Sequence, residues 1–200
     1  RAAGIGIVPS GGRTGLSGGA VAANGELVLS LERMNKVLAF DAVDRVLTVQ
    51  AGIALEKAQD AAREQGLQYP VDFAARGSCT IGGNIATNAG GINVLRYGMT
   101  RELVLGVEAV LPDGSLWEGM TGLRKNNRGY DLSQLLIGSE GTLGIITGVE
   151  VKLFPKPAIV ETAYLGASAF VDAMTLYGLA RRVCSDLMTA FEVIGSECLP

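Results

Sequence analysis

The sequence predicts a fold of the α+β class, and three observations support this prediction. Segments with strand periodicity and segments with helix periodicity follow one another without strict βαβ alternation. Hydrophobic residues make up 48% of the 200 residues and charged residues only 18%, so the chain can bury a sizeable core. Two prolines, Pro155 and Pro157, end a strand and stiffen a connector. We therefore expect one domain over residues 1–155 and the start of a second over residues 156–200.

The first third of the chain is expected to hold three short strands and one helix. Residues 5–9 are an apolar run that ends on a proline, residues 26–31 alternate as a strand does, and residues 45–50 are rich in β-branched side chains. Apolar residues between 53 and 62 recur at helical spacing, and Gly66 is placed to end that helix.

The middle of the chain is expected to form a loop followed by a hairpin. Residues 69–94 show no regular period and have the composition of a loop. Residues 103–111 are typical of a buried strand, and residues 115–119 of the strand that returns beside it. Between them the sequence Pro-Asp-Gly, residues 112–114, predicts a tight turn, because proline presets φ and glycine accepts a positive φ.

Two further elements are expected before the proline pair. Residues 131–137 predict a helix with Asp131 near its N-terminus, and Tyr130 is expected to pack against it. Residues 144–154 predict a strand that leads to Pro155.

The last part of the chain predicts a strand over 159–165, a helix over 168–182 and a strand over 187–194. The chain starts with Arg1, shows no signal-peptide pattern, and stops just after an apolar run at Pro200. We therefore expect it to be a fragment of a longer protein.

Composition excludes several classes of function. The net charge is −3 with no basic block, so no nucleic-acid partner is expected, and no run of about 20 apolar residues predicts a membrane span. The chain has no histidine, which removes the common catalytic triads and the commonest metal ligand. Cys79, Cys184 and Cys198 have the spacing of neither a zinc site nor a disulfide framework, so reduced thiols are expected.

Three glycine-rich clusters carry the strongest functional signal. The first cluster is GGRTGLSGG (11–19), the second is RGSCTIGGNIATNAGG (76–91) and the third is GSEGTLGIIT (138–147). Each is either an ordinary loop or a loop that turns successive backbone N–H groups toward an anion. Such a nest binds a phosphate without a lysine, and glycine permits both the conformation and the close approach.

Two common phosphate loops do not fit these clusters. A Walker loop ends in Gly-Lys-Ser/Thr, and the chain contains no Gly-Lys pair. A Rossmann turn needs G-x-G-x-x-G between a strand and a helix, whereas the first cluster lacks this spacing and precedes a predicted strand.

The motifs together resemble a known family. The order P-x-G-G-x-T-G-L-S-G-G, G-S-x-x-I-G-G-N-x-A-T-N-A-G-G, R-Y-G, G-Y-D-L and G-S-E-G-T-L-G-I-I-T, closing on P-K-P, is similar to the FAD-binding domain of the vanillyl-alcohol oxidase (PCMH) type. Within it, the chain most resembles the FAD-linked D-2-hydroxyacid dehydrogenases, which act on 2-hydroxyglutarate, lactate or glycolate. The resemblance covers about residues 5–165 and implies two α+β subdomains that hold FAD, followed by a cap domain that binds substrate.

The resemblance also implies which residues bind the cofactor. The pyrophosphate loop would be Ser10, Gly11, Gly12, Arg13, Thr14, Gly15 and Leu16. The pyrophosphate, ribityl and flavin region would be lined by Gly77, Ser78, Gly82, Gly83, Asn84, Thr87, Asn88 and Gly91, with Pro70 and Asp72 near the isoalloxazine ring or shaping that loop. Glu140, Gly141, Gly144 and Ile145 would face the adenosine end.

Each assignment has a simpler alternative. Asp72 and Glu140 are also typical turn or capping carboxylates, and Asn84 and Asn88 can satisfy loop backbone. For the first cluster, we expect Gly12→Val to place a side chain where a phosphate oxygen approaches and so to remove FAD.

The implied chemistry is the oxidation of a D-2-hydroxy acid to the 2-oxo acid, with hydride transfer to flavin N5 and reoxidation by a separate electron acceptor. We expect non-covalent FAD because some members attach the flavin through His or Cys and this chain has no His. The catalytic base and any divalent-metal ligands are expected in the cap, beyond the chain, so no catalytic residue is assigned. The resemblance is compatible with a homodimer and with the cytoplasm or the mitochondrial matrix.

Two alternatives remain open. One is an FAD-dependent enzyme for another alcohol or an ether-lipid precursor, and the other is a non-catalytic FAD-binding or nucleotide-binding fragment.

Overall fold

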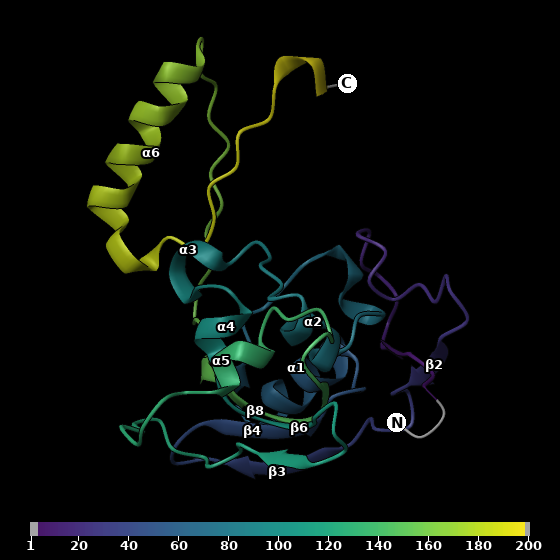
Figure 1. Cartoon of the computed structure of the whole chain (residues 1–200). Helices are drawn as coiled ribbons and strands as arrows, with labels where there is room; N and C mark the ends of the chain where they lie inside the picture. The colour runs from purple at the N-terminus through teal and green to yellow at the C-terminus, as the bar shows by residue number, and fades with distance from the viewer. Residues whose placement is uncertain (1–3, 199–200) are drawn as a thin grey trace.

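A computed structural model describes residues 4–198 and shows an antiparallel sheet covered by helices on one face, with a helical arm extending from it (Figure 1). The sheet has five strands in the order β3-β4-β8-β6-β7, and every neighbouring pair is antiparallel. Its strands are β3 (Val37–Asp41), β4 (Val46–Gln50), β8 (Ile145–Lys152), β6 (Val104–Val110) and β7 (Leu116–Glu118). The two chain ends, Arg1 and Pro200, on which the expectation of a fragment rests, lie outside the described residues.

Two small sheets and a set of short helices complete the fold. The strands are β1 (Ile7–Ser10) paired in parallel with β2 (Leu27–Ser30), and β5 (Leu67–Gln68) paired with β9 (Phe154–Pro155). The helices are α1 (Leu55–Glu64), α2 (Ile81–Ala86), α3 (Val94–Tyr97), α4 (Thr100–Leu103), α5 (Ser133–Leu136) and α6 (Phe170–Cys184). The 3₁₀ turns are Ala74–Gly77, Ser185–Leu187 and Ser196–Cys198. None of the helices within residues 4–198 is long and apolar enough to cross a membrane.

The core lies between the central strands and the helices α1 and α2. Helix α1 buries Leu55, Ala58 and Ala62, which fall on one face at helical spacing. Strand β8 is buried along most of its length because it is the central strand and both sheet faces are covered. All buried residues of the main core cluster lie between residues 47 and 153.

A long loop covers the second face of the sheet. The carboxylate of Glu150, on β8, accepts a hydrogen bond of 2.7 Å from the backbone N–H of Gly122. The guanidinium of Arg124 donates to three carbonyls, those of Asp44 (2.5 Å), Arg45 (3.4 Å) and Leu153 (3.4 Å). The loop after β7 is therefore tied to the sheet.

The α+β prediction is confirmed, and several predicted elements are found close to their expected places. Strands β1, β2, β4, β6 and β8, the hairpin to β7 and helices α1 and α6 all match predicted segments to within a few residues. Gly66 ends α1 at φ +70° and Gly114 closes the hairpin turn at φ +88°, as the turn chemistry requires.

Other expectations were wrong. Strand β3 was missed, and residues 69–94 contain α2 and the start of α3 as well as loops. Helix α5 has four residues instead of seven, and Tyr130 is 94% exposed rather than packed.

The two arm strands expected over 159–165 and 187–194 are not found: Leu187 ends the 3₁₀ turn Ser185–Leu187, and the remaining residues of both segments have no regular secondary structure. A segment rich in β-forming residues becomes a strand only where the edge of another strand offers it hydrogen-bond partners. No described strand pairs with either segment of the arm.

Candidate cofactor-binding site

The three glycine clusters meet at one cavity of about 450 Å³. The cavity lies where α2, the loop after β1 and the turn before β8 come together. Fourteen of the residues predicted to bind a cofactor line it: Gly11, Gly12, Arg13, Thr14, Gly15, Leu16, Gly82, Gly83, Asn84, Thr87, Glu140, Gly141, Gly144 and Ile145. Segments more than 120 residues apart in the sequence thus form a single site.

The first cluster presents free backbone donors at this cavity. None of the N–H groups of residues 11–17 donates a hydrogen bond to another part of the chain between residues 4 and 198. Arg13 holds φ +54°, a left-handed conformation that is costly for a side chain other than glycine. Unpaired successive amides and a left-handed residue among them are features that an anion-binding nest requires.

Gly12 is required for a reason different from the expected one. A Cβ atom built on Gly12 would overlap the carbonyl oxygen of Ser78 and lie 2.8 Å from Cα of Cys79. The missing side chain therefore lets the first cluster rest on the backbone of the second, rather than leaving space for a phosphate oxygen. The Gly12→Val substitution would displace the loop itself.

The second cluster places a polar side chain in the cavity wall. Thr80 caps helix α2 by accepting a 3.3 Å hydrogen bond from the backbone N–H of Gly83. One turn later, Asn84 is only 4% exposed and lines the cavity beside Cys79. Its amide interacts with the Cys79 thiol, a weak acceptor, and its Nδ2 has no other hydrogen-bond partner among the described residues. A buried amide that lacks a partner is costly unless a ligand or water supplies an acceptor.

The third cluster touches both of the others. Its backbone N–H groups at Gly138 and Glu140 donate to Ile85 (2.9 Å) and Ala86 (2.8 Å) at the end of α2. Glu140 holds φ +55°, and a Cβ on Gly141 would lie 2.7 Å from Cγ of Pro9. Close approach to Pro9 on β1 and a φ of +77° thus explain Gly141, and the carboxylate of Glu140 lies beside Gly19 of the first cluster.

Seven predicted residues do not line this cavity: Ser10, Pro70, Asp72, Gly77, Ser78, Asn88 and Gly91. Ser10 ends β1, where its carbonyl accepts a 3.0 Å hydrogen bond from Leu31. Ser78 lines a second hollow of about 240 Å³ together with Arg13 and Lys57. Gly11, Gly12 and Arg13 of the first cluster line both this hollow and the cavity. Gly91, at φ +109°, lies against the backbone of Asp72.

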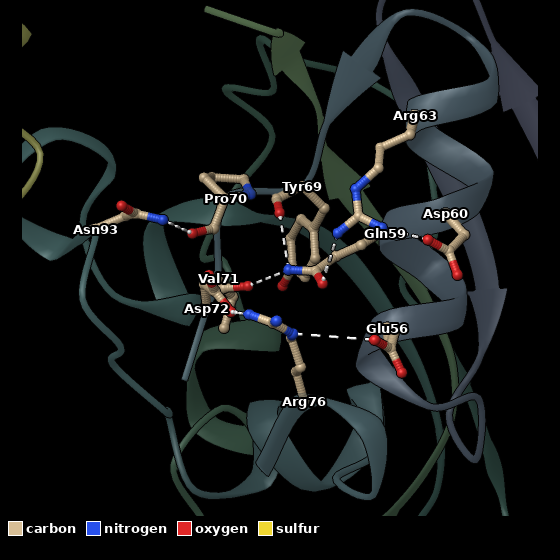
Figure 2. Close-up of polar contacts among 10 residues, drawn as sticks. All are labelled: Glu56, Gln59, Asp60, Arg63, Tyr69, Pro70, Val71, Asp72, Arg76 and Asn93. Carbon is tan, nitrogen blue, oxygen red and sulfur yellow. Dashed lines mark hydrogen bonds and ion pairs between the residues drawn. The ribbon is translucent and has the colours of Figure 1, made fainter. Parts of the chain in front are cut away.

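Figure 2 shows how the segment around Pro70 and Asp72 is held. The carbonyl of Val71 accepts from Gln59 Nε2 (2.7 Å), and the carbonyl of Pro70 accepts from Asn93 Nδ2 (2.9 Å). The carboxylate of Asp72 accepts from Arg76 (2.9 Å), and this hydrogen bond raises the pKa of the guanidinium. Asp72 thus braces the turn that carries Phe73 into the cavity wall.

Two buried groups beside the cavity keep their protons. Burial raises the pKa of the Cys79 thiol, which lines the cavity and is 2% exposed. Burial also raises the pKa of Tyr69, whose hydroxyl has no partner among the described residues. Neither group is an anion at neutral pH, so neither repels a phosphate.

The sequence reading missed the apolar part of the wall. Leu31, Phe73 and Ile146 line the cavity. Ile146 belongs to the third cluster, Phe73 precedes the second cluster and Leu31 directly follows β2, so the signal that was available was this position along the chain rather than a motif of their own.

A family profile described as an FAD binding domain matches residues 1–119. The chain belongs to this FAD-binding domain family. A D-2-hydroxyglutarate dehydrogenase of Xanthomonas citri pv. viticola is 60% identical over 177 residues, which cover 88% of this chain and 38% of that relative. The mitochondrial D-2-hydroxyglutarate dehydrogenase of Bos taurus is 47% identical over 195 residues, 98% of this chain and 36% of its own length.

Solved structures agree with the family assignment. The FAD-binding domain resembles a structure of alkyldihydroxyacetonephosphate synthase with a TM-score of 0.67 and 30% identity, covering 78% of this chain and 27% of that one. The chain therefore spans well under half the length of the relatives that it matches.

Proposed function

We propose that the chain is the cofactor-binding part of a flavoenzyme that oxidises a D-2-hydroxy acid to the corresponding 2-oxo acid. The observation that carries the proposal is the meeting of three glycine clusters at one cavity with unpaired backbone donors. The relatives named as D-2-hydroxyglutarate dehydrogenases support the hydroxy-acid class, because they align over 88–98% of the chain.

The cavity fits an extended dinucleotide. The free amides of residues 11–17 would hold the pyrophosphate, and Nδ2 of Asn84, whose only neighbour of this kind is the weakly accepting Cys79 thiol, would donate to an acceptor atom of the cofactor. Glu140, Gly141, Gly144 and Ile145 would line the adenosine end. Pro70, Asp72, Gly77, Ser78, Asn88 and Gly91, which do not line the cavity, would act by shaping the loops that do.

The chain contributes binding, orientation and shielding rather than acid–base groups. When bound, FAD supplies a hydride acceptor at N5. Phe73, Leu31 and Ile146 would exclude water from one wall, and the neutral Cys79 thiol adds no charge there. Non-covalent attachment is supported by the absence of histidine from the sequence and by the burial of this thiol.

The catalytic base, the substrate contacts and any divalent metal would come from a cap domain that begins after residue 155. A separate acceptor would reoxidise the flavin, and the protein would be a homodimer. Relatives include mitochondrial proteins, so the cytoplasm and the mitochondrial matrix are both proposed locations.

The test uses the full-length protein that contains this chain. We expect a flavin absorption spectrum, and we expect acid precipitation to leave a colourless pellet with free flavin in the supernatant. Anaerobic addition of D-2-hydroxyglutarate, D-lactate or glycolate should bleach the flavin with at least one substrate. A protein without flavin, or a flavin that no hydroxy acid reduces, would contradict the proposal.

A second candidate is an FAD enzyme with an ether-lipid precursor or another alcohol as substrate. The similarity to alkyldihydroxyacetonephosphate synthase favours this second candidate. That similarity is at 30% sequence identity, whereas the D-2-hydroxyglutarate dehydrogenase of Xanthomonas citri pv. viticola is 60% identical, which favours the first. The same substrate panel separates the two, because only the first enzyme is bleached by hydroxy acids.

A further inference from the structure

Arg101, on helix α4, is a half-buried cation that contacts only neutral groups in the part of the chain described. Its guanidinium donates to the carbonyl of Gln134 (2.8 Å), to Oε1 of Gln134 (2.9 Å) and to the carbonyl of Ile137 (2.5 Å). No carboxylate of residues 4–198 lies within ion-pair distance of it. The charge is instead matched to the carbonyl dipoles at the end of helix α5.

The backbone of the same residue fixes the end of the second cluster. The N–H of Arg101 donates to Oδ1 of Asn88 (3.0 Å), which holds φ +49°. Its neighbour Thr100 donates twice to the carbonyl of Ala89, from the backbone N–H (3.0 Å) and from the hydroxyl (2.6 Å). The strained end of the second cluster is thus held by helix α4.

The side chain lies directly behind the junction of the second and third clusters. That junction consists of the Gly138 and Glu140 hydrogen bonds to the end of α2 described above. A Cβ on Gly138 would lie 3.1 Å from Nη2 of Arg101 and 3.5 Å from Cβ of Asn88. Arg101 does not itself line the cavity, so it acts through the residues that do.

We propose that Arg101 is a positioning residue for the cofactor, because its guanidinium and its backbone together fix the second and third clusters against each other. The inference rests on the proposed FAD site. It assigns a role in cofactor affinity to a residue that has no contact with the cavity. A planar fork suits this role, because Nη1 donates to the carbonyl of Gln134 and Nη2 to that of Ile137, whereas a lysine ammonium is a compact point charge on a flexible stem.

The test compares Arg101→Gln with Arg124→Gln in the full chain. Arg124 is a matched control because its guanidinium also donates to three backbone carbonyls, but at the turn between β3 and β4 and the end of β8 that is opposite to Ile145. FAD affinity is measured by titrating apoprotein and following flavin fluorescence, and unfolding temperature is measured without FAD. We expect Arg101→Gln to weaken FAD binding about ten- to a hundredfold, by analogy with the loss of metal affinity when residues that orient metal ligands are removed.

Further readouts separate positioning from general loss of stability. Arg101→Lys should also bind FAD weakly although it keeps the charge, and FAD bound to Arg101→Gln at saturation should show a shifted visible spectrum. Arg124→Gln should lower the unfolding temperature while keeping the affinity and the spectrum.

The outcomes distinguish the two proposals. If the unmodified chain binds FAD and Arg101→Gln binds it equally well, the positioning role is refuted while the function stands. Equal weakening by Arg124→Gln would also refute it. If the unmodified chain does not bind FAD, both the proposed function and this inference fail.

Discussion

Gly12 has no room for a side chain, because the backbone of Ser78 and Cys79 occupies the space where a Cβ would lie. Gly12→Ala should therefore push the first cluster away from the second, costing about 1–3 kcal/mol of stability as overpacking does and weakening FAD binding. Gly166→Ala is the control, since nothing lies within 4 Å of its Cβ position. Urea unfolding and FAD titration of both variants check this. Equal FAD affinity in Gly12→Ala and Gly166→Ala would show that the contact does not shape the site.

The three thiols differ in burial, and their reactivity should follow it. Cys184 and Cys198 are exposed, whereas burial raises the pKa of Cys79. Alkylation by iodoacetamide at pH 8 should therefore modify two cysteines quickly and Cys79 only after denaturation, because the thiolate is the reactive form. Peptide mass spectrometry after timed quenching measures this. Rapid labelling of Cys79 in folded protein would mean that the cavity wall opens readily.

The raised pKa of Cys79 predicts how the free energy of unfolding depends on pH. An unfolded chain ionises it near its ordinary pKa of about 8.5, whereas the folded chain retains the proton to higher pH. The contribution of this thiol to stability is therefore complete below its pKa in the unfolded chain, and it is lost as the pH rises through its pKa in the folded chain. Cys79→Ser should reduce the decline in unfolding free energy between pH 8 and 10, measured by urea titration.

At the scale of elements, helix α6 contains an exposed glycine in its interior. Gly178 lies near the middle of Phe170–Cys184, and a Cβ there would meet no atom within 4 Å. Gly178→Ala should stabilise the helix by about 1 kcal/mol, because alanine loses less conformational entropy. Amide hydrogen exchange of residues 170–184 should slow, while exchange in α1 should not change. Faster exchange in α6 would indicate a packing role for the glycine that the described residues do not show.

The elements also show what the sequence can and cannot predict. Helix α1 was found because burial gives it a helical period, strand β8 because it is a short apolar run rich in β-branched residues, and the glycine clusters because their residue types are unusual. Helix α2 was missed because its six residues, IGGNIA, include two glycines, and Gly82 is needed where the helix packs on Ala51. From the sequence, Arg101 was expected either to reach phosphate or substrate or to be a surface charge; its contacts with Gln134 and Ile137 could not be predicted, since these segments meet only in three dimensions.

At the scale of the whole molecule, the arm and the body differ in how they are held. Within residues 156–198 only Ala173 is buried among the hydrophobic residues, whereas Tyr164, Phe170 and Val183 are at least 70% exposed. Figure 1 shows α6 standing apart from the sheet and its helices. An exposed apolar surface of this kind is typical of a contact with further protein. This pattern supports the proposed division at residue 155, with the arm as the start of a cap domain.

The division predicts the behaviour of a chain that ends at Ala158, after β9 has paired with β5. Every residue of the main core cluster and of the cavity lies between residues 9 and 153. The shortened chain should therefore bind FAD with an affinity within about twofold of the full chain, a difference of less than 1 kcal/mol. It should also be more soluble, because the exposed apolar side chains of the arm are removed. Flavin titration, thermal unfolding and light scattering of the two chains measure these properties. Loss of FAD binding with a folded sheet would show that the arm contributes to the site, and the boundary would then have to be moved beyond it.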